Sequence, residues 1–309
     1  MRIKRRLGRI AKCAFVLAAL PAVAPGCAKP EVSIPAGARI EGYDALARQI
    51  AADPMAFLQE CFVATKALDA FTTHFQRQER LGILRELRPM ENITAEYRNR
   101  PFSVRFTWRD EKSEYRQAAY VQGREDNKVL LLPRKGALGL PPTVQRFPVS
   151  FAVLFQKARN PITDFGPRRM MERTIDRIVK AKAIGDVSIQ LRDATEIGPS
   201  KEPCFHFEIR YPPKDEFPCK LQDLYVHTRT RLPVATYLWL PGREERTDET
   251  LDGMYVYSNL DPDVVLTDAH FVIAADPGRA GKQSRVARGG KKEQAGEPAQ
   301  AAALPEEIP

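Results

Sequence analysis

The sequence predicts an α+β fold: a strongly curved antiparallel sheet, an incomplete barrel, with about two helices packed on its concave face. The first observation is a change of period. Residues 43–68 and 167–183 repeat apolar side chains at helical spacing, whereas from Phe71 onward apolar and polar side chains alternate in short segments. The second observation is that aromatic side chains recur on one side of several of these segments. This alternation is typical of antiparallel sheets with one face against a core.

The first helical stretch has a clear internal boundary. Residues 43–52 and 54–68 are separated by Asp53, an N-cap type, and Pro54 then occupies the first helical position. The second segment carries one apolar stripe, made of Phe57, Cys61, Ala64 and Leu68. We therefore expect an amphipathic helix here.

A long helix is predicted over residues 167–183. It begins behind Asp164 or Gly166, with Pro167 at its first position, and it ends at Gly185. Its apolar stripe consists of Met171, Ile175 and Ile178. Arg and Glu side chains occupy the opposite side, so this helix is also expected to cover a core.

The remaining periodic segments predict roughly ten strands. They cover residues 71–82, 83–98, 101–110, 116–123, 127–133, 187–197, 204–212, 221–230, 233–241 and 250–260. Residues 141–155 fit either a strand or a loop. Strands on both sides of one long helix indicate a single large sheet.

The two ends of the sequence differ from this middle part. Residues 1–26 combine basic residues with a short apolar run, as in a signal peptide for export. Cys27 follows a sequence that resembles a lipobox, which predicts a lipid anchor, although the run Ala22–Ala24 also fits cleavage for free secretion. Residues 27–40 are predicted to be a tether, 41–277 a single half-barrel domain, and 278–309 a disordered basic and Ala-rich tail.

Most of the positive charge lies in these ends. The formal net charge is +9, of which residues 1–26 contribute +6 and the tail +2, so that +1 remains for residues 27–277. A nearly neutral domain argues against nucleic acid as a partner. The expected location is the periplasm, with anchoring to the outer membrane as the lipid-modified alternative.

Cysteine usage agrees with export. Cys204 and Cys219 flank two extended pieces joined by a Pro-rich turn, which predicts a disulfide across a hairpin. The alternative is a pair of buried free thiols. Cys61 is expected to be a small core residue.

No catalytic or metal-binding motif is present. The sequence has no GxSxG, no HExxH, no paired CxxC and no phosphate-binding glycine loop. His206, His227 and His270 would have to converge through the sheet to hold a metal, and we predict no metal, no cofactor and no catalytic residue. The protein is therefore not expected to be an enzyme.

The apolar face of the sheet carries the functional prediction. Its candidate cavity-lining residues are Phe102, Val104, Phe106, Trp108, Tyr237 and Trp239. Two helices of this length are expected to leave part of so wide a face uncovered, and the remainder would be a cavity for a lipid-sized ligand. The alternative is that helices and loops fill the space and form an ordinary core.

Several motifs, taken in order, resemble a known family. They are FTTHFQRQERLG, RNRPFSVRFTWRD, AAYVQGREDNKVLLLP, NPITDFGPRRMMERTIDRI, LPVATYLWLPG and MYVYSNLDPDVVLTDAHF. Over about residues 55–272 the chain resembles the bacterial family catalogued as domain of unknown function 1571. That family is similar in architecture to the outer-membrane lipoprotein carriers, and the resemblance implies binding or transfer of a lipid or acyl chain. It implies no catalytic residues.

Three functions follow as hypotheses. The first is an exported, non-enzymatic envelope protein, with or without a lipid on Cys27, that binds or carries an apolar ligand in a half-barrel cavity. Its partners would be that ligand and, through Cys27, a membrane. The second is an envelope protein–protein interaction module with a filled core, whose partner the sequence does not identify. A hydrolase with an unrecognised site is a third.

Overall fold

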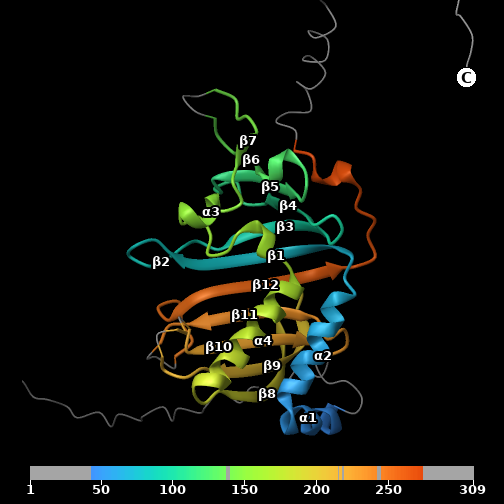
Figure 1. Ribbon diagram of the computed structural model, residues 1–309, viewed down its shortest axis with the longest axis vertical. Coiled ribbons are helices and arrows are strands. Elements are labelled where there is room, and N and C mark those ends of the chain that lie inside the picture. Colours follow the sequence, from blue (N-terminus) through green and yellow to red (C-terminus); the bar gives the residue numbers. More distant parts are fainter. Residues whose placement is uncertain (1–42, 137–139, 215, 218, 242–244, 274–309) are drawn as a thin grey trace, which may run out of the picture. The chain divides into compact units, whose positions relative to one another are not determined.

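The computed structural model describes residues 43–136, 140–214, 216–217, 219–241 and 245–273 (Figure 1). The predicted signal peptide (1–26), the predicted tether with Cys27 (27–40) and the predicted tail (278–309) lie outside the described residues. Among the described residues, no helix is long and apolar enough to cross a membrane.

The described chain forms one sheet and a set of helices. The strands are β1 (Ala70–Leu81), β2 (Glu86–Leu87), β3 (Glu91–Arg98), β4 (Ser103–Trp108), β5 (Tyr115–Val121), β6 (Val129–Pro133), β7 (Gln145–Phe147), β8 (Ser188–Ile197), β9 (Glu202–Arg210), β10 (Leu221–His227), β11 (Pro233–Trp239) and β12 (Leu251–Asp261). The α-helices are α1 (Tyr43–Ala52), α2 (Pro54–Lys66), α3 (Phe151–Leu154) and α4 (Pro167–Ile184). Short 3-10 helices are η2 (Glu125–Asn127), η4 (Ile162–Asp164) and η5 (Asp268–Phe271).

The sheet is antiparallel throughout, in the order β7-β6-β5-β4-β3-β1-β12-β11-β10-β9-β8, with β2 paired to β1. Its centre is the pair β1 and β12, where Phe75 lies opposite Tyr257. From β7 at one edge, the chain reaches β8 at the other through α3 and α4 (Figure 1). Because β7 and β8 do not pair with each other in the described chain, the sheet is curved but open. The predicted α+β class, an incomplete antiparallel barrel, is confirmed.

The predicted starts of both main helices are also confirmed, although α2 ends at Lys66, before Leu68. The backbone N–H of Ala56 donates to Oδ1 of Asp53 at 3.0 Å, and Pro54 is the first residue of α2. α4 begins with Pro167 behind Gly166 and ends before Gly185. Residues 141–155, which fitted either strand or loop, contain both β7 and α3.

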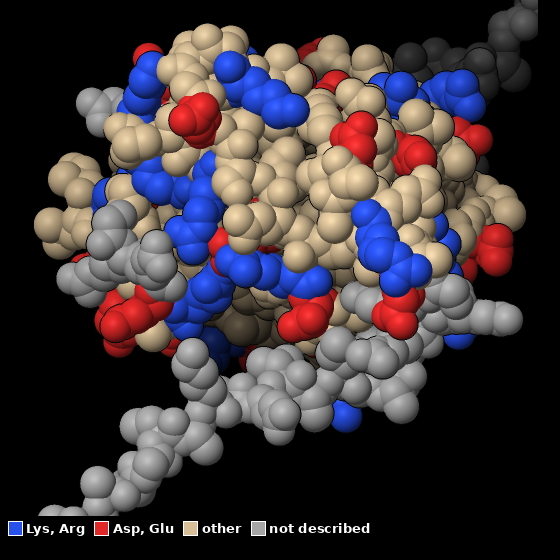
Figure 2. Space-filling view, turned by 90° about the horizontal axis from the view of Figure 1, so that it is seen from below, with Lys and Arg blue, Asp and Glu red and all other residues tan. Residues whose placement is uncertain are grey.

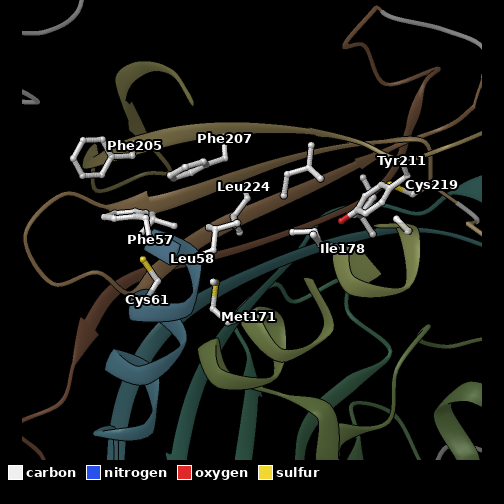
Figure 3. Close-up of a cluster of buried hydrophobic side chains, with 14 of the residues drawn as sticks. Phe57, Leu58, Cys61, Met171, Ile178, Phe205, Phe207, Tyr211, Cys219 and Leu224 are labelled. Carbon is white, nitrogen blue, oxygen red and sulfur yellow. The ribbon is translucent and has the colours of Figure 1, made fainter. Parts of the chain in front are cut away.

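One hydrophobic core lies where α2 and α4 cover β9, β10 and β11 (Figure 3). Its fully buried members include Leu58, Cys61, Met171, Ile178, Phe205, Phe207 and Leu224. The ring of Phe57 stacks on Phe207 at 5.6 Å and meets Phe205 edge-on at 5.6 Å. Cys61 is therefore a core residue, as predicted.

A second core fills the concave face of β1, β3 and β4. It consists mainly of aromatic rings, among them Phe71, Phe75, Tyr97, Phe106, Trp108, Phe165 and Tyr257. All of these except Phe165 belong to strands, whereas Phe165 comes from the segment between η4 and α4. The two cores do not meet completely, and a cavity remains between them under α3 and α4.

Candidate functional site: a cavity on the concave face

A cavity of about 390 Å³ lies against the concave face of the sheet. Its floor comes from β1, β3–β6 and β10–β12, and its other walls come from α3, the segment 157–165 and α4. Gln222 of β10 and Trp108 of β4 mark its two sides, and five strand spacings of ~4.8 Å separate them. The cavity is thus elongated across the strands, over roughly 24 Å.

Strand register explains which side chains meet on this floor. Three rows of directly paired residues cross the sheet: Trp108–Ile93–Phe75–Tyr257, Glu91–Arg77–Tyr255–Thr236, and Glu79–Gly253–Leu238–Gln222. The first row is apolar, and the other two carry charged groups at the β1 end. Gly253 has no side chain, and this leaves room for the guanidinium of Arg159. If position 253 carried a Cβ atom, that atom would lie only 3.4 Å from Nη1 of Arg159.

Phe165 closes the apolar side of the cavity. Its ring meets Phe106 edge-on at 4.9 Å and Phe75 edge-on at 5.1 Å. The next residue, Gly166, has a φ of 115°, which L side chains rarely adopt. Its N–H donates to the hydroxyl of Tyr257 at 3.3 Å. This glycine lets the chain turn into α4 while Phe165 points at the sheet.

A half-buried ion pair lies beside this aromatic wall. Nη2 of Arg77 lies 2.5 Å from Oε2 of Glu91, and Trp108 Nε1 donates to Oε1 of the same carboxylate at 2.8 Å. Burial alone would lower the pKa of Arg77, but the charges of Glu91 and Glu79 outweigh it and raise that pKa. Arg77 therefore stays positively charged, and the carboxylate of Glu91 is its ion-pair partner.

Glu79 is the second carboxylate of the cavity, and its oxygens are occupied. Tyr255 donates its hydroxyl to Oε1 at 2.6 Å, and the backbone N–H of Arg159 donates to Oε2 at 3.2 Å. Burial, followed by the charge of Glu79, raises the pKa of Tyr255 well above its ordinary value. Tyr255 thus remains a neutral hydrogen-bond donor.

The opposite end of the cavity floor, under α4, is polar, and its described residues include no carboxylate. Gln222 accepts hydrogen bonds from Arg177 Nη1 at 3.1 Å and from the hydroxyl of Tyr211 at 2.7 Å. Its amide nitrogen donates to the hydroxyls of Thr174 at 3.0 Å and Thr236 at 2.9 Å. Gln222 is buried, and both its donors and both its acceptor positions are used.

The cavity reaches the surface near α3. Lys157 and Glu114 both line it, and they form an ion pair of 2.7 Å whose side chains are 41% and 58% exposed. An exposed pair of this kind contributes little to stability. A ligand could therefore pass this point without disrupting the fold.

Four of the predicted cavity-lining residues lie on the expected face. Phe106 and Trp108 line the cavity directly. Val104 is fully buried in the same aromatic core without reaching the cavity. Phe102 is half-buried at the edge of this core, edge-on to Tyr97 at 5.6 Å.

The prediction for Tyr237 and Trp239 is wrong, because both lie on the opposite face of the sheet. They belong to a separate cluster with Leu251 and Met254, whereas their neighbour Leu238 lines the cavity. β11 is apolar on both faces: Tyr237 and Trp239 lie on one face, and Val234 and Leu238 lie on the other. Alternation alone therefore could not indicate which face is concave.

The convex face instead carries a charged network. Asp223 accepts hydrogen bonds from Trp239 Nε1 at 2.6 Å and Arg246 Nε at 2.7 Å, and His206 Nε2 lies 2.7 Å from its other oxygen. Burial raises the pKa of Asp223, but the hydrogen bonds from His206 and Arg246 outweigh burial and lower it to about 2. Glu208 has three arginine partners, namely Arg192 at 2.7 Å, Arg246 at 2.6 Å and Arg210 at 2.8 Å.

Arg192 and Arg210 belong to β8 and β9, at one edge of the sheet. Figure 2, which views the molecule from below Figure 1, shows Lys and Arg side chains gathered around a hollow, with acidic side chains at its border. For Glu208, the hydrogen bonds from the arginines outweigh the effect of burial and lower its pKa to about 2. The network fixes the β11–β12 loop, which carries Arg246, to the sheet.

The predicted disulfide between Cys204 and Cys219 is also wrong, since both are free and buried. In the β9–β10 hairpin, Cys204 is paired with His227 at one end of the strands, and Arg210 is paired with Leu221 at the other end. Cys219 comes before Leu221 in the chain and lies beyond that second end. Eight residue steps of ~3.3 Å, from the level of Cys204 to that of Cys219, place the two thiols roughly 26 Å apart along the hairpin. Figure 3 shows Phe205, the neighbour of Cys204, and Cys219 at opposite ends of the core. The turn lies further along the chain than the Pro-rich segment suggested.

The three histidines considered for a metal have separate partners. His206 lies beside Asp223, His227 lies 3.7 Å from Glu202, and His270 accepts from the backbone N–H of Thr267 at 3.0 Å. In the part of the chain that the structure describes, no three His, Cys, Asp or Glu side chains could together hold a metal ion.

The charged side of the cavity was missed at the sequence level. Arg77 and Glu79 lie two residues apart on β1, on the same face as Phe75. This alternation was visible, but charged residues on a strand are more often at the surface. The signal that could have identified them is their alternation with Phe75, because a residue two positions from a core aromatic on a strand faces the same side of the sheet.

Comparison with known families identifies the family of this chain. Residues 68–277 match the model of a family described as "Protein of unknown function (DUF1571)". The resemblance based on the motifs is thereby confirmed. No curated protein matches the sequence.

Several solved structures are distantly similar. The crystal structure of MucB matches with 14% identity and a TM-score of 0.43, over 72% of this chain and 64% of that one, less than two thirds of its length. Lipoprotein LppX of Mycobacterium tuberculosis matches with 11% identity and a TM-score of 0.39, over 70% and 100% of the two chains. A LolA superfamily protein from Nitrosomonas europaea matches with 10% identity and a TM-score of 0.24, over 71% and 96%.

Proposed function

The chain belongs to the DUF1571 family of proteins of unknown function, and we propose that it is a non-enzymatic cell-envelope protein that holds an acyl chain or another apolar ligand in its cavity. The observation that carries this proposal is the cavity itself. Its volume of about 390 Å³ falls within the range of ~300–1000 Å³ that is usual for small-molecule sites.

The cavity lining supports an apolar ligand. One long wall consists of the aromatic rings of Phe75, Phe106, Trp108, Phe165 and Tyr257. Rings of this kind offer a large apolar surface at little entropic cost, because each has few rotatable bonds. The shape supports a single chain, because the space crosses several strands and has a modest volume.

The chemistry of the lining favours binding over catalysis. Both carboxylates of the cavity floor, Glu79 and Glu91, are engaged by hydrogen bonds or an ion pair. The thiol that lines the cavity, Cys219, has its pKa raised to about 11 by burial, so it is protonated at neutral pH and a poor nucleophile. No histidine is found among the described residues that line the cavity.

The envelope location rests on the sequence pattern of residues 1–26 and on Cys27. A basic segment followed by a short apolar run is typical of exported proteins. The periplasm, with or without an outer-membrane anchor, would provide both lipids and a need to carry them through water.

Mass spectrometry of organic extracts tests the proposed function. The protein is purified without detergent, extracted, and compared with an unrelated exported protein prepared in parallel. We expect a lipid or fatty acid to co-purify in a near-stoichiometric amount. If no lipid co-purifies and the delipidated protein also takes up none, the alternative of an interaction module with a filled core is favoured.

A further inference from the structure

The guanidinium of Arg177 differs from the other arginines that line the cavity. Arg77 pairs with Glu91, Arg159 pairs with Asp252, and Arg173 pairs with Asp164. Among the described residues, Arg177 forms no ion pair with a carboxylate, and its hydrogen bond goes to the neutral amide of Gln222. Arg177 is half-buried, and an anionic group of a ligand would supply the counter-charge that this cation lacks among its described neighbours.

Gln222 and Tyr211 hold this guanidinium in place. Gln222 has used all of its hydrogen-bonding capacity, so it cannot itself bind a ligand. The Cζ atom of Arg177 lies 5.5 Å from the ring centre of Tyr211, which is the range of a cation–π contact. Arginine has five N–H donors, and the contact to Gln222 leaves most of them for an anion.

Among the described residues of the cavity floor, no carboxylate lies beside Arg177. Gln222 and Glu79 lie in the same register row, three strand spacings or ~14 Å apart. Burial raises the pKa of Tyr211 and of Cys219 above their ordinary values, so both are neutral at pH 7. No described residue of the cavity floor therefore offsets the positive charge of Arg177.

We infer that the cavity takes a single-chain anionic amphiphile. Its carboxylate or phosphate head is bound by Arg177 at the β10 end, and its chain runs along the aromatic wall toward β4. Charge-assisted hydrogen bonds from a guanidinium to either head are short and strong. The volume of about 390 Å³ has room for one such chain, if each methylene takes about the space of a water molecule, ~30 Å³. This inference rests on the proposed function and specifies its ligand class and orientation.

Three ligands with the same chain test it: dodecanoic acid, dodecyl phosphate and 1-dodecanol. Each is titrated into the delipidated full chain, by displacement of a fluorescent apolar probe at neutral pH. We expect the acid or the phosphate to bind roughly tenfold or more tightly than the alcohol, since a hydrogen bond to a charged group is worth about that factor. The better of the two anions identifies the head group.

The variant Arg177→Gln removes the charge and keeps a polar side chain. It should lose the preference for anions, by roughly tenfold or more, while its affinity for 1-dodecanol stays unchanged. Arg173→Gln is the matched control, because Arg173 lies one turn earlier on α4, lines the same cavity and is already paired with Asp164. It should keep the preference.

Two results would overturn the inference. The wild type could bind all three ligands with equal affinity, or Arg177→Gln could weaken the acid, the phosphate and the alcohol alike, which would mean that Arg177 only maintains the cavity. Both differ from failure of the proposed function, in which none of the three ligands displaces the probe. Circular dichroism melting of each variant checks that the fold is retained.

Discussion

The ring of Phe165 packs edge-on against the ring of Phe106, with centroids 4.9 Å apart and planes at 80°. Phe165 precedes the first turn of α4, whereas Phe106 lies in β4. The contact therefore ties the segment above the cavity to the strand that forms its floor. Both the stability of the domain and the shape of the cavity depend on it.

Replacing Phe165 with alanine should destabilise the protein by about 3 kcal/mol, because a buried ring leaves a space that its neighbours cannot fill. Urea unfolding at pH 7 measures this change. Phe155→Ala is the matched control, since the ring of Phe155 is 64% exposed, and its effect should be within about 0.5 kcal/mol. Equal effects of the two substitutions would mean that Phe165 does not hold the core together.

The stability should fall in acid because of Asp223 and Glu208. Their pKa values are about 2 in the folded protein, against 3.8 and 4.5 as ordinary values. A carboxylate whose pKa is lower in the folded than in the unfolded protein stabilises the fold at pH values above its ordinary pKa. This stabilisation is lost as the pH falls from about 4.5 toward 2. Each group contributes on the order of 2 kcal/mol.

The pH dependence is measured by urea unfolding at several values between neutral and acid pH. Glu208→Gln should flatten the acid part of the curve, since the variant has one fewer carboxylate to protonate. Asp69→Asn, in an exposed pair with Arg100, should leave it unchanged. An unaltered curve for Glu208→Gln would contradict the assignment.

Cys204 and Cys219 should be thiols in the protein as exported. Alkylation in denaturant without a reducing agent should label both, and mass spectrometry of the peptides detects the added groups. In the folded protein both should react slowly, because burial raises their pKa values. A peptide pair linked by a disulfide would show that the hairpin register is wrong.

Cys27→Ser should release the protein from the membrane fraction, if the lipid anchor predicted for Cys27 is attached. The measurement is immunoblotting of membrane and soluble fractions of the cell envelope. Cys61→Ser serves as a control for the loss of a cysteine elsewhere in the chain. If wild type and Cys27→Ser are distributed alike, free secretion is supported.

Much of this fold was predictable from the sequence because its signals are local. Asp53 followed by Pro54, and Gly166 followed by Pro167, define helix starts that depend on the backbone alone. The alternation along β4 placed Phe106 on the concave face because the other face of that strand is polar.

The wrong predictions concern segments whose local sequence pattern is compatible with two arrangements in the fold. β11 carries apolar side chains on both faces, so the position of Trp239 depends on its partners in β10 and β12. The separation of Cys204 from Cys219 depends on where the hairpin turns, and this follows from register. Arg177 and Gln222 meet only because α4 crosses β10, a contact between residues distant in sequence.

The central claim is that an acyl chain occupies the cavity, and filling the cavity tests it most directly. Ala118 lines the cavity wall, so Ala118→Trp should occupy the space that the chain would take. Val63→Trp is the matched control, because Val63 is 61% exposed on α2 and does not line the cavity. The measurement is calorimetric titration of each delipidated protein with a fatty acid. We expect one-to-one binding by the wild type and by Val63→Trp, and at least a roughly tenfold loss in Ala118→Trp. Equal binding by both variants, with the fold intact, would contradict the claim.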